Sequence, residues 1–231
     1  MRKRLLLLIG LTGTLFAGET YNFKNLITGE FNFKTKAEMI VYSPIRAKDN
    51  SIQSAKIPVE ITSSNEKVKK NKENGYTFVN KANIRIIAPN GQKIDTLTKV
   101  TLITDKDYRT LSLTEETNTA GQKIVINCKN NGDLAKIDKN PFIKEIGYIS
   151  EKDNLICDDK SNRSAIFRIE KGEKNGTANL VFLREMKFGK DTIKDKTIVN
   201  INKDGHMNKI ETEIIAKNKF EIKFTSKNIN Q

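Results

Sequence analysis

Alternation of apolar and polar residues is the feature that most constrains what this chain can fold into. Between Tyr21 and Val41 the odd positions are mostly apolar and the even positions mostly polar. A period of two predicts a β-strand with one buried and one solvated face. We expect Gly29 to divide this segment into two strands and Pro44 to end it. No segment longer than about eight residues shows a helical period.

The same pattern recurs along the rest of the chain. It predicts further strands at 56–62, 76–88, 99–104, 109–114, 122–128, 142–150, 164–169, 178–183, 192–201, 207–215 and 220–225. Pro58 suggests an edge position for the first of these. Hairpin turns are expected at Pro89-Asn90-Gly91, Lys174-Asn175-Gly176 and Asp204-Gly205. Short helical turns are possible at Asp133–Ile137 and Glu185–Phe188.

Short, mostly hairpin-linked strands at regular spacing predict an all-β fold. We expect an antiparallel β-sandwich of immunoglobulin-like or fimbrial type in residues 18–231, either one unit or two stacked sandwiches. The polar stretch 129–140 is the best candidate for a sub-boundary. An outer-membrane barrel would also alternate, but aromatic residues make up only 7% of the chain and tryptophan is absent. Such barrels carry aromatic girdles, so we favour the sandwich.

Residues 1–17 have the order of a bacterial secretory signal peptide. Arg2, Lys3 and Arg4 are followed by an apolar run, Leu5–Phe16, and by the small residues Ala17 and Gly18. This run is too short to span a bilayer as a helix. We therefore expect an exported protein of the periplasm, cell surface or extracellular space, without a transmembrane anchor.

The chain is basic, with a formal net charge of +13 and 33 lysines against 8 arginines. Positive charge suggests an anionic partner, such as an acidic glycan or lipopolysaccharide. Lysine, isoleucine and asparagine share A/T-rich codons, so a biased genome would give the same composition without selection for a ligand. We expect no nucleic-acid partner, because arginine is scarce and no basic run is interleaved with aromatic residues.

Cys128 and Cys157 are the two cysteines of the chain. In an exported protein an even number of cysteines favours a disulfide. The alternative, a pair of free thiols with one acting as a nucleophile, would need a base, and the single histidine, His206, follows the expected Asp204-Gly205 turn.

Catalytic motifs are missing from the sequence. It contains no G-x-S-x-G elbow, no phosphate-binding loop and no H-E-x-x-H zinc motif. The adjacent carboxylates Glu115-Glu116 and Asp158-Asp159 should point to opposite faces of a strand, so neither forms a glycosidase dyad by itself. The acidic clusters at 105–107 and 191–195 lack the spacing of a calcium loop. We expect no enzyme, no cofactor and no metal.

The segment Glu19–Ile27 is the most suggestive functional element, since a free alternating strand can complete a neighbour's sheet. Its candidate donor residues are Tyr21, Phe23 and Ile27. The layout of signal, first strand and β-pattern is similar to that of exported fimbrial subunits, although no family motif supports the likeness. We expect a non-enzymatic surface or fimbrial-type subunit or adhesin that binds or assembles. Pairing within its own domain, a secreted carboxylate-dependent hydrolase, and a periplasmic protein that binds anionic envelope polymers remain the alternatives.

Overall fold

A single antiparallel sheet forms the described part of the molecule. The computed structural model describes residues 21, 31–44, 52–72, 74–106, 109–131, 146–149 and 153–227. The strands are β1 (Asn32–Pro44), β2 (Ile52–Asn65), β3 (Lys69–Lys70), β4 (Tyr76–Ile87), β5 (Lys93–Thr104), β6 (Thr110–Thr119), β7 (Gln122–Asn130), β8 (Asp153–Cys157), β9 (Asn162–Lys171), β10 (Thr177–Phe188), β11 (Asp191–Asn202), β12 (Met207–Ala216) and β13 (Phe220–Lys227). The described residues are built of strands and offer no helix capable of crossing a bilayer.

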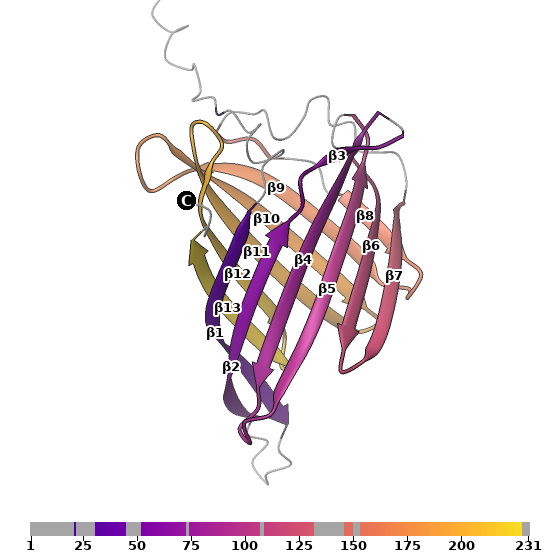
Figure 1. Ribbon diagram of the computed structural model, residues 1–231, viewed down its shortest axis with the longest axis vertical. Helices are drawn as coiled ribbons and strands as arrows, with labels where there is room; N and C mark the ends of the chain where they lie inside the picture. The colour runs from indigo at the N-terminus through magenta and orange to yellow at the C-terminus, as the bar shows by residue number, and fades with distance from the viewer. Residues whose placement is uncertain are drawn as a thin grey trace, which may run out of the picture.

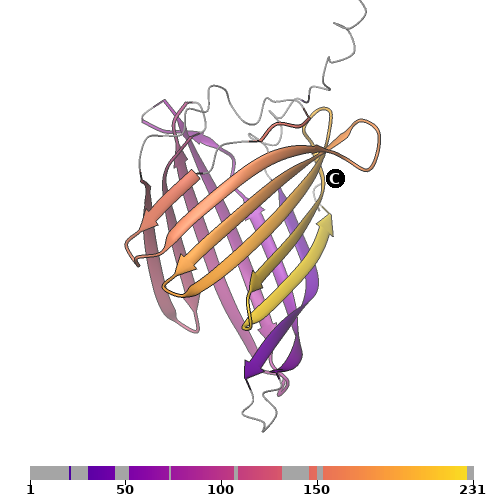
Figure 2. The same cartoon turned by 180° about the vertical axis from the view of Figure 1, so that it is seen from behind.

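The sheet closes on itself (Figures 1 and 2). β2 pairs with β4, and the first strand pairs with the last, from Glu38↔Lys223 to Val41↔Phe220. Twelve strands thus form an up-and-down barrel, and the short strand β3 lies outside it.

The predicted β-sandwich is therefore wrong, although the all-β composition is confirmed. Alternation gives each strand one buried face in a sandwich and in a barrel alike, so it does not distinguish them. What decides between them is the pairing of β1 with β13, a contact between the two ends of the chain.

Turn chemistry explains the meander. The three predicted hairpins are present, and their glycines Gly91, Gly176 and Gly205 adopt positive φ angles of 81°, 75° and 82°. Only glycine reaches this region without strain from a side chain.

The proposed helical turn at Glu185–Phe188 is wrong, because these residues continue β10, and the one at 133–137 lies outside the described residues. Pro58 lies just beyond the last residue of β2 that pairs with β4, which is Val59. Because proline lacks a backbone N–H, this position avoids the loss of a hydrogen bond between β2 and β4.

The two faces of the barrel wall differ sharply in chemistry. Ion pairs cover the outer face on most strands; examples are Glu38–Lys56, Arg85–Asp95, Glu116–Lys123, Lys209–Glu211 and Glu213–Lys223. Residues paired across strands share a face. The face that carries Phe167 and Leu180 contains the buried hydrophobic core, so apolar side chains are concentrated on the inside.

A hydrophobic core fills one end of the barrel. Ile169, Leu180 and Ile201 are fully buried in it, beside the turns that join β9 to β10 and β11 to β12. The rest of this cluster is Tyr21, Phe33, Val59, Ile61, Phe167, Ala178, Val199, Met207, Ile210 and Ile222. Other inner-face residues, such as Ile84 and Ile94, are only half-buried. Eight strands already enclose enough space for side chains to fill, so twelve leave more.

Candidate functional site

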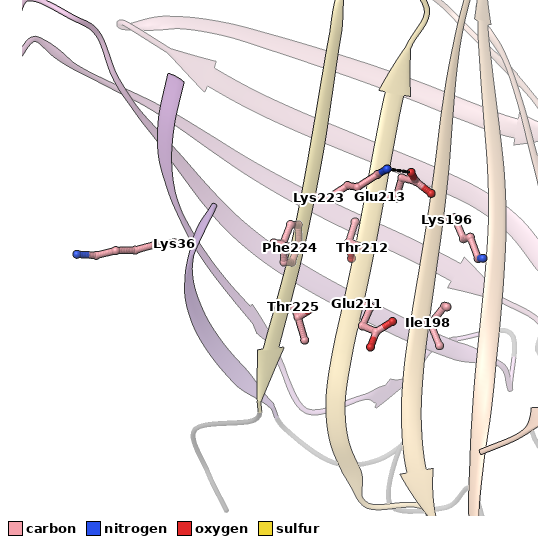
Figure 3. A pocket seen from close by; sticks show the side chains of 9 residues that line it. All are labelled: Lys36, Lys196, Ile198, Glu211, Thr212, Glu213, Lys223, Phe224 and Thr225. Atoms are coloured by element: carbon pink, nitrogen blue, oxygen red, sulfur yellow. Dashed lines mark ion pairs between the residues drawn. The ribbon is translucent and has the colours of Figure 1, made fainter. Parts of the chain in front are cut away.

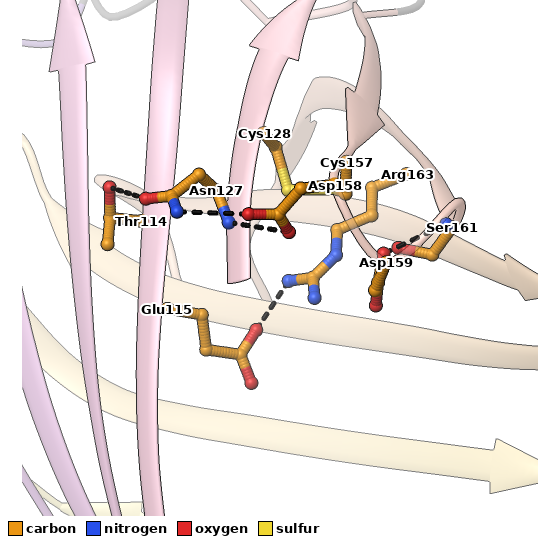
Figure 4. Close-up of a disulfide and its surroundings, with 9 residues drawn as sticks. All are labelled: Thr114, Glu115, Asn127, Cys128, Cys157, Asp158, Asp159, Ser161 and Arg163. Carbon is orange, nitrogen blue, oxygen red and sulfur yellow. Dashed lines mark hydrogen bonds and ion pairs between the residues drawn. A yellow bond between two sulfur atoms is a disulfide. The ribbon is translucent and has the colours of Figure 1, made fainter. Parts of the chain in front are cut away.

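The predicted disulfide between Cys128 and Cys157 is present (Figure 4). It joins β7 to β8, whose ladder comprises only three residue pairs. Asn127 and Asp158 reinforce the same seam: the backbone N–H and the side-chain amide of Asn127 donate to the two Asp158 oxygens at 3.1 and 3.0 Å. These hydrogen bonds from Asn127 lower the pKa of Asp158. The disulfide therefore lies where the barrel wall is held by few backbone bonds.

Two arginines lie on the inner wall near this seam. Register places Arg184 of β10 opposite Ala165 of β9, and Met186 opposite Arg163. Arg163 and Arg184 are thus diagonal neighbours on one face. Their strands also carry the inward-facing Phe167 and Leu180 of the core. The two guanidinium groups therefore face the barrel interior rather than the solvated outer wall.

Arg163 is nearly buried and only partly satisfied. Its Nη1 donates to the carboxylate of Glu115, which reaches it from β6 (Figure 4). The Arg163 side chain is 11% exposed. Its Nε and Nη2 are buried without a hydrogen-bond partner among the described residues. These two atoms form the side of a guanidinium that grips a carboxylate or phosphate with two parallel hydrogen bonds.

Arg184 is held more openly. Its Nη2 donates to Asp195 at 2.7 Å and to the hydroxyl of Thr197 at 2.8 Å, while 53% of its side chain remains exposed. Thr197 lies within hydrogen-bonding distance of Thr212 on the next strand, at 3.4 Å. The Arg184 guanidinium is therefore held in place by Asp195 and Thr197, and about half of its side chain is still accessible.

A third carboxylate, Asp153, begins β8 on the same face, opposite Ala165. Burial raises its pKa, and the hydroxyl of Thr110, which donates to it at 3.3 Å, opposes this shift. Together the inner wall carries the charged strip Glu115, Asp153, Arg163, Arg184 and Asp195. We call it the inner charged strip.

The remaining inner surface beside this strip is apolar and half-buried. It includes Met186 and Ile193, which share the face of Arg184 and Asp195 by register. Phe182 and Ile214 lie on the same face and pack against the core cluster. A molecule with an apolar part and an anionic group would find a matching surface for each.

A shallow depression of about 560 Å³ marks the wall formed by β1 and β11–β13 (Figure 3). Most of its lining consists of outward-facing polar residues; the full lining is Lys36, Lys196, Ile198, Glu211, Thr212, Glu213, Lys223, Phe224 and Thr225. Lys223 bridges Glu213 and Glu221 at 2.6 and 2.8 Å, which raises the pKa of Lys223 and lowers that of Glu221. Lys223, Glu213 and Glu221 thus form a surface ion-pair network, and we assign the depression no ligand.

Of the candidate donor residues, only Tyr21 lies within the described part of the chain. Its ring is buried in the core of its own barrel, and its hydroxyl donates to the backbone oxygen of Thr177 at 3.0 Å. Phe23 and Ile27 lie outside the described residues. Strand donation by this segment therefore remains a prediction.

The other residues singled out from the sequence are dispersed. Glu115 points inward to Arg163 and Glu116 outward to Lys99 and Lys123, so these neighbouring carboxylates do occupy opposite faces. His206 lies in the β11–β12 turn, where its N–H donates to the side chain of Asn202. Within the described residues, no three His, Cys, Asp or Glu side chains gather as metal ligands would.

Sequence reasoning missed Arg163 and Arg184, although the sequence does contain a signal, and it considered Asp195 only as part of the acidic cluster at 191–195. Arg163 is in phase with Phe167 and Ile169, and Arg184 with Leu180 and Phe182. A charged residue in phase with apolar ones is an inward-facing charge once the strand is recognised. Neither its partner nor its distance from other strands can be read from that pattern.

Comparison with known proteins gives no guide to function. No protein-family model matches the chain, and neither a curated protein nor a solved structure matches it.

Proposed function

We propose that this protein is an exported binding protein that takes an anionic, amphipathic molecule against the inner wall of its barrel. Arg163 and Arg184 would hold a carboxylate or phosphate group, and the half-buried apolar residues beside them would contact the hydrocarbon part. This ligand class includes lipopolysaccharide, one of the anionic partners that the basic composition suggested.

The unpartnered side of Arg163 carries the proposal. Leaving N–H groups of a buried cation without an acceptor costs stability, and the cost is larger than for a neutral donor. An anionic head group would supply the acceptor that the described residues do not. Glu115 accepts from Nη1 of the same guanidinium, so the Nε and Nη2 atoms of Arg163 remain available to an anionic ligand.

Charge placement supports the same conclusion. Lysine is the dominant cation of the chain, yet the cations within the inner charged strip are both arginine. Arginine is the side chain suited to a planar, bidentate contact with an anion, whereas lysine acts as a point charge. Lysines such as Lys123 and Lys223 instead form ion pairs on the outer wall.

The alternative of a carboxylate-dependent hydrolase finds less support. Glu115 and Asp195 each form an ion pair with an arginine of the inner charged strip, so both carboxylates already have a partner within the wall. The raised pKa of Asp153 is the one observation that favours it.

A matched pair of substitutions on β9 tests the proposal. Arg163→Gln removes the inward guanidinium, and Arg168→Gln removes the guanidinium of Arg168, which pairs with Glu170 on the outer wall. We would titrate each variant with palmitate, and with hexadecanol as the uncharged probe, by displacement of a fluorescent fatty acid.

We expect the wild type and Arg168→Gln to bind palmitate alike and in preference to the alcohol. Arg163→Gln should bind it about tenfold more weakly or worse, from the loss of a charge-assisted hydrogen-bonded contact. Equal binding of palmitate by both variants would show that Arg163 does not hold the anionic group, and the proposal would fail. Failure of the wild type to bind any anionic amphiphile, phosphatidic acid included, would also reject it.

A further inference from the structure

The lower part of β7 is an unpaired strand edge. β7 pairs with β6 from Gln122 to Lys129, but with β8 only from Cys128 to Asn130. The strand therefore runs on beyond the end of β8 (Figure 1). Among the described residues, no strand pairs with Gln122–Asn127 on that side.

The backbone groups that face this open side can be identified. The carbonyl of Asn127 accepts a hydrogen bond from the N–H of Asp158 at 3.0 Å, so Asn127 faces the β8 side. In an antiparallel sheet the N–H and C=O of one residue point to the same neighbour, and alternate residues point the same way. Val125 and Lys123 therefore present their N–H and C=O groups to the open side.

The side chains at this edge are apolar and exposed. Ile124 and Val125 are 58% and 45% exposed. Natural proteins blunt exposed edges with proline, charge or bulges. The comparable stretch of β2, residues 52–58, which β4 does not pair, carries Pro58. Gln122–Ile126 contains no proline, and its single charge, Lys123, is neutralised by Glu116 at 2.7 Å.

We infer that this edge pairs with the same edge of a second copy of the chain, in an antiparallel two-fold dimer. One register uses all the free backbone groups: Lys123 lies opposite Val125 of the partner subunit, and Val125 opposite the partner subunit's Lys123. Ile124 then faces Ile124 of the partner subunit on the two-fold axis.

Side-chain chemistry fits this register. The two lysines are each opposite a valine rather than each other, so like charges do not meet across the pair. Two isoleucines in direct cross-strand contact bury apolar surface that is exposed in the single chain. An edge that pairs with itself gives a closed, isologous dimer rather than an open fibre. The proposal is independent of ligand binding on the inner wall.

Sedimentation equilibrium over a wide concentration range tests the dimer. The wild type should approach twice the monomer mass. Val125→Pro should stay at the monomer mass, because it removes an N–H that faces the open side while sparing the ladder with β6. Val125→Thr, which keeps that N–H and a β-branched side chain, is the matched control and should dimerise.

Ile124→Lys and Ile124→Glu test the register itself. Each variant alone should remain a monomer, since like charges would meet on the two-fold axis. An equimolar mixture of the two should recover the dimer mass. A wild-type chain that stays monomeric at the highest concentration, or a Val125→Pro variant that dimerises like wild type, would overturn the proposal. Dimers of both single charged variants would reject this register.

Discussion

The disulfide should contribute strongly to stability, because it closes the seam that has the shortest ladder in the barrel wall. Cys128 and Cys157 are 29 residues apart in sequence, and β7 meets β8 in only three residue pairs. The chain-entropy relation gives about 3.6 kcal/mol for a closed loop of this length. We expect the free energy of unfolding to fall by about 3 to 4 kcal/mol when the bond is reduced.

Urea unfolding of the same protein with and without a phosphine reductant measures this difference directly. The double variant Cys128→Ala/Cys157→Ala serves as the control, because the reductant should leave its unfolding curve unchanged. Coincident curves for oxidised and reduced wild type would refute the reasoning. A fall in stability accompanied by a changed denaturant slope would show that the seam opens separately from the rest of the barrel.

Two further changes probe the wall and the core. Asp153→Asn should raise stability at neutral pH relative to wild type but not near pH 3. The raised pKa of Asp153 means that the folded state binds the Asp153 proton more tightly than the unfolded state does. The stability of the wild type therefore falls as the pH rises above the pKa that Asp153 has in the unfolded chain. Urea unfolding curves of both proteins from about pH 3 to neutral pH test whether the difference in stability has this direction. Leu180→Ala should cost about 2 to 5 kcal/mol, since Leu180 is fully buried. Leu97→Ala, at a residue that is 53% exposed, should change the urea midpoint little.

Much of the fold could be predicted from local pattern. Alternation located most of the described strands, and Gly91, Gly176 and Gly205 marked their turns because a tight hairpin needs positive φ. The disulfide was predicted from the even number of cysteines and from the expected export of the chain, and it is present. The strands and turns depend on residues that are close together in the sequence, and the disulfide depends on the number of cysteines.

Closure of the barrel could not be predicted in this way. It depends on β1 meeting β13, and the pattern of either strand is equally satisfied by a sandwich. The inner charged strip was missed for a related reason. Glu115 and Arg163 are separated by 48 positions and come together only because β6 and β9 curve around the same interior. Phase along a strand identifies an inward charge, but only the closed sheet identifies its partner.

The Arg163 side chain offers the most direct test of the account. Its Nε–H gives a nuclear magnetic resonance signal that can be assigned by its loss in Arg163→Gln, with the signal of Arg168 as an internal reference. Titration with palmitate should shift the Arg163 signal in step with binding and leave that of Arg168 in place. A protein that becomes saturated with palmitate while the Arg163 signal stays fixed would contradict the proposal that this guanidinium holds the anionic group.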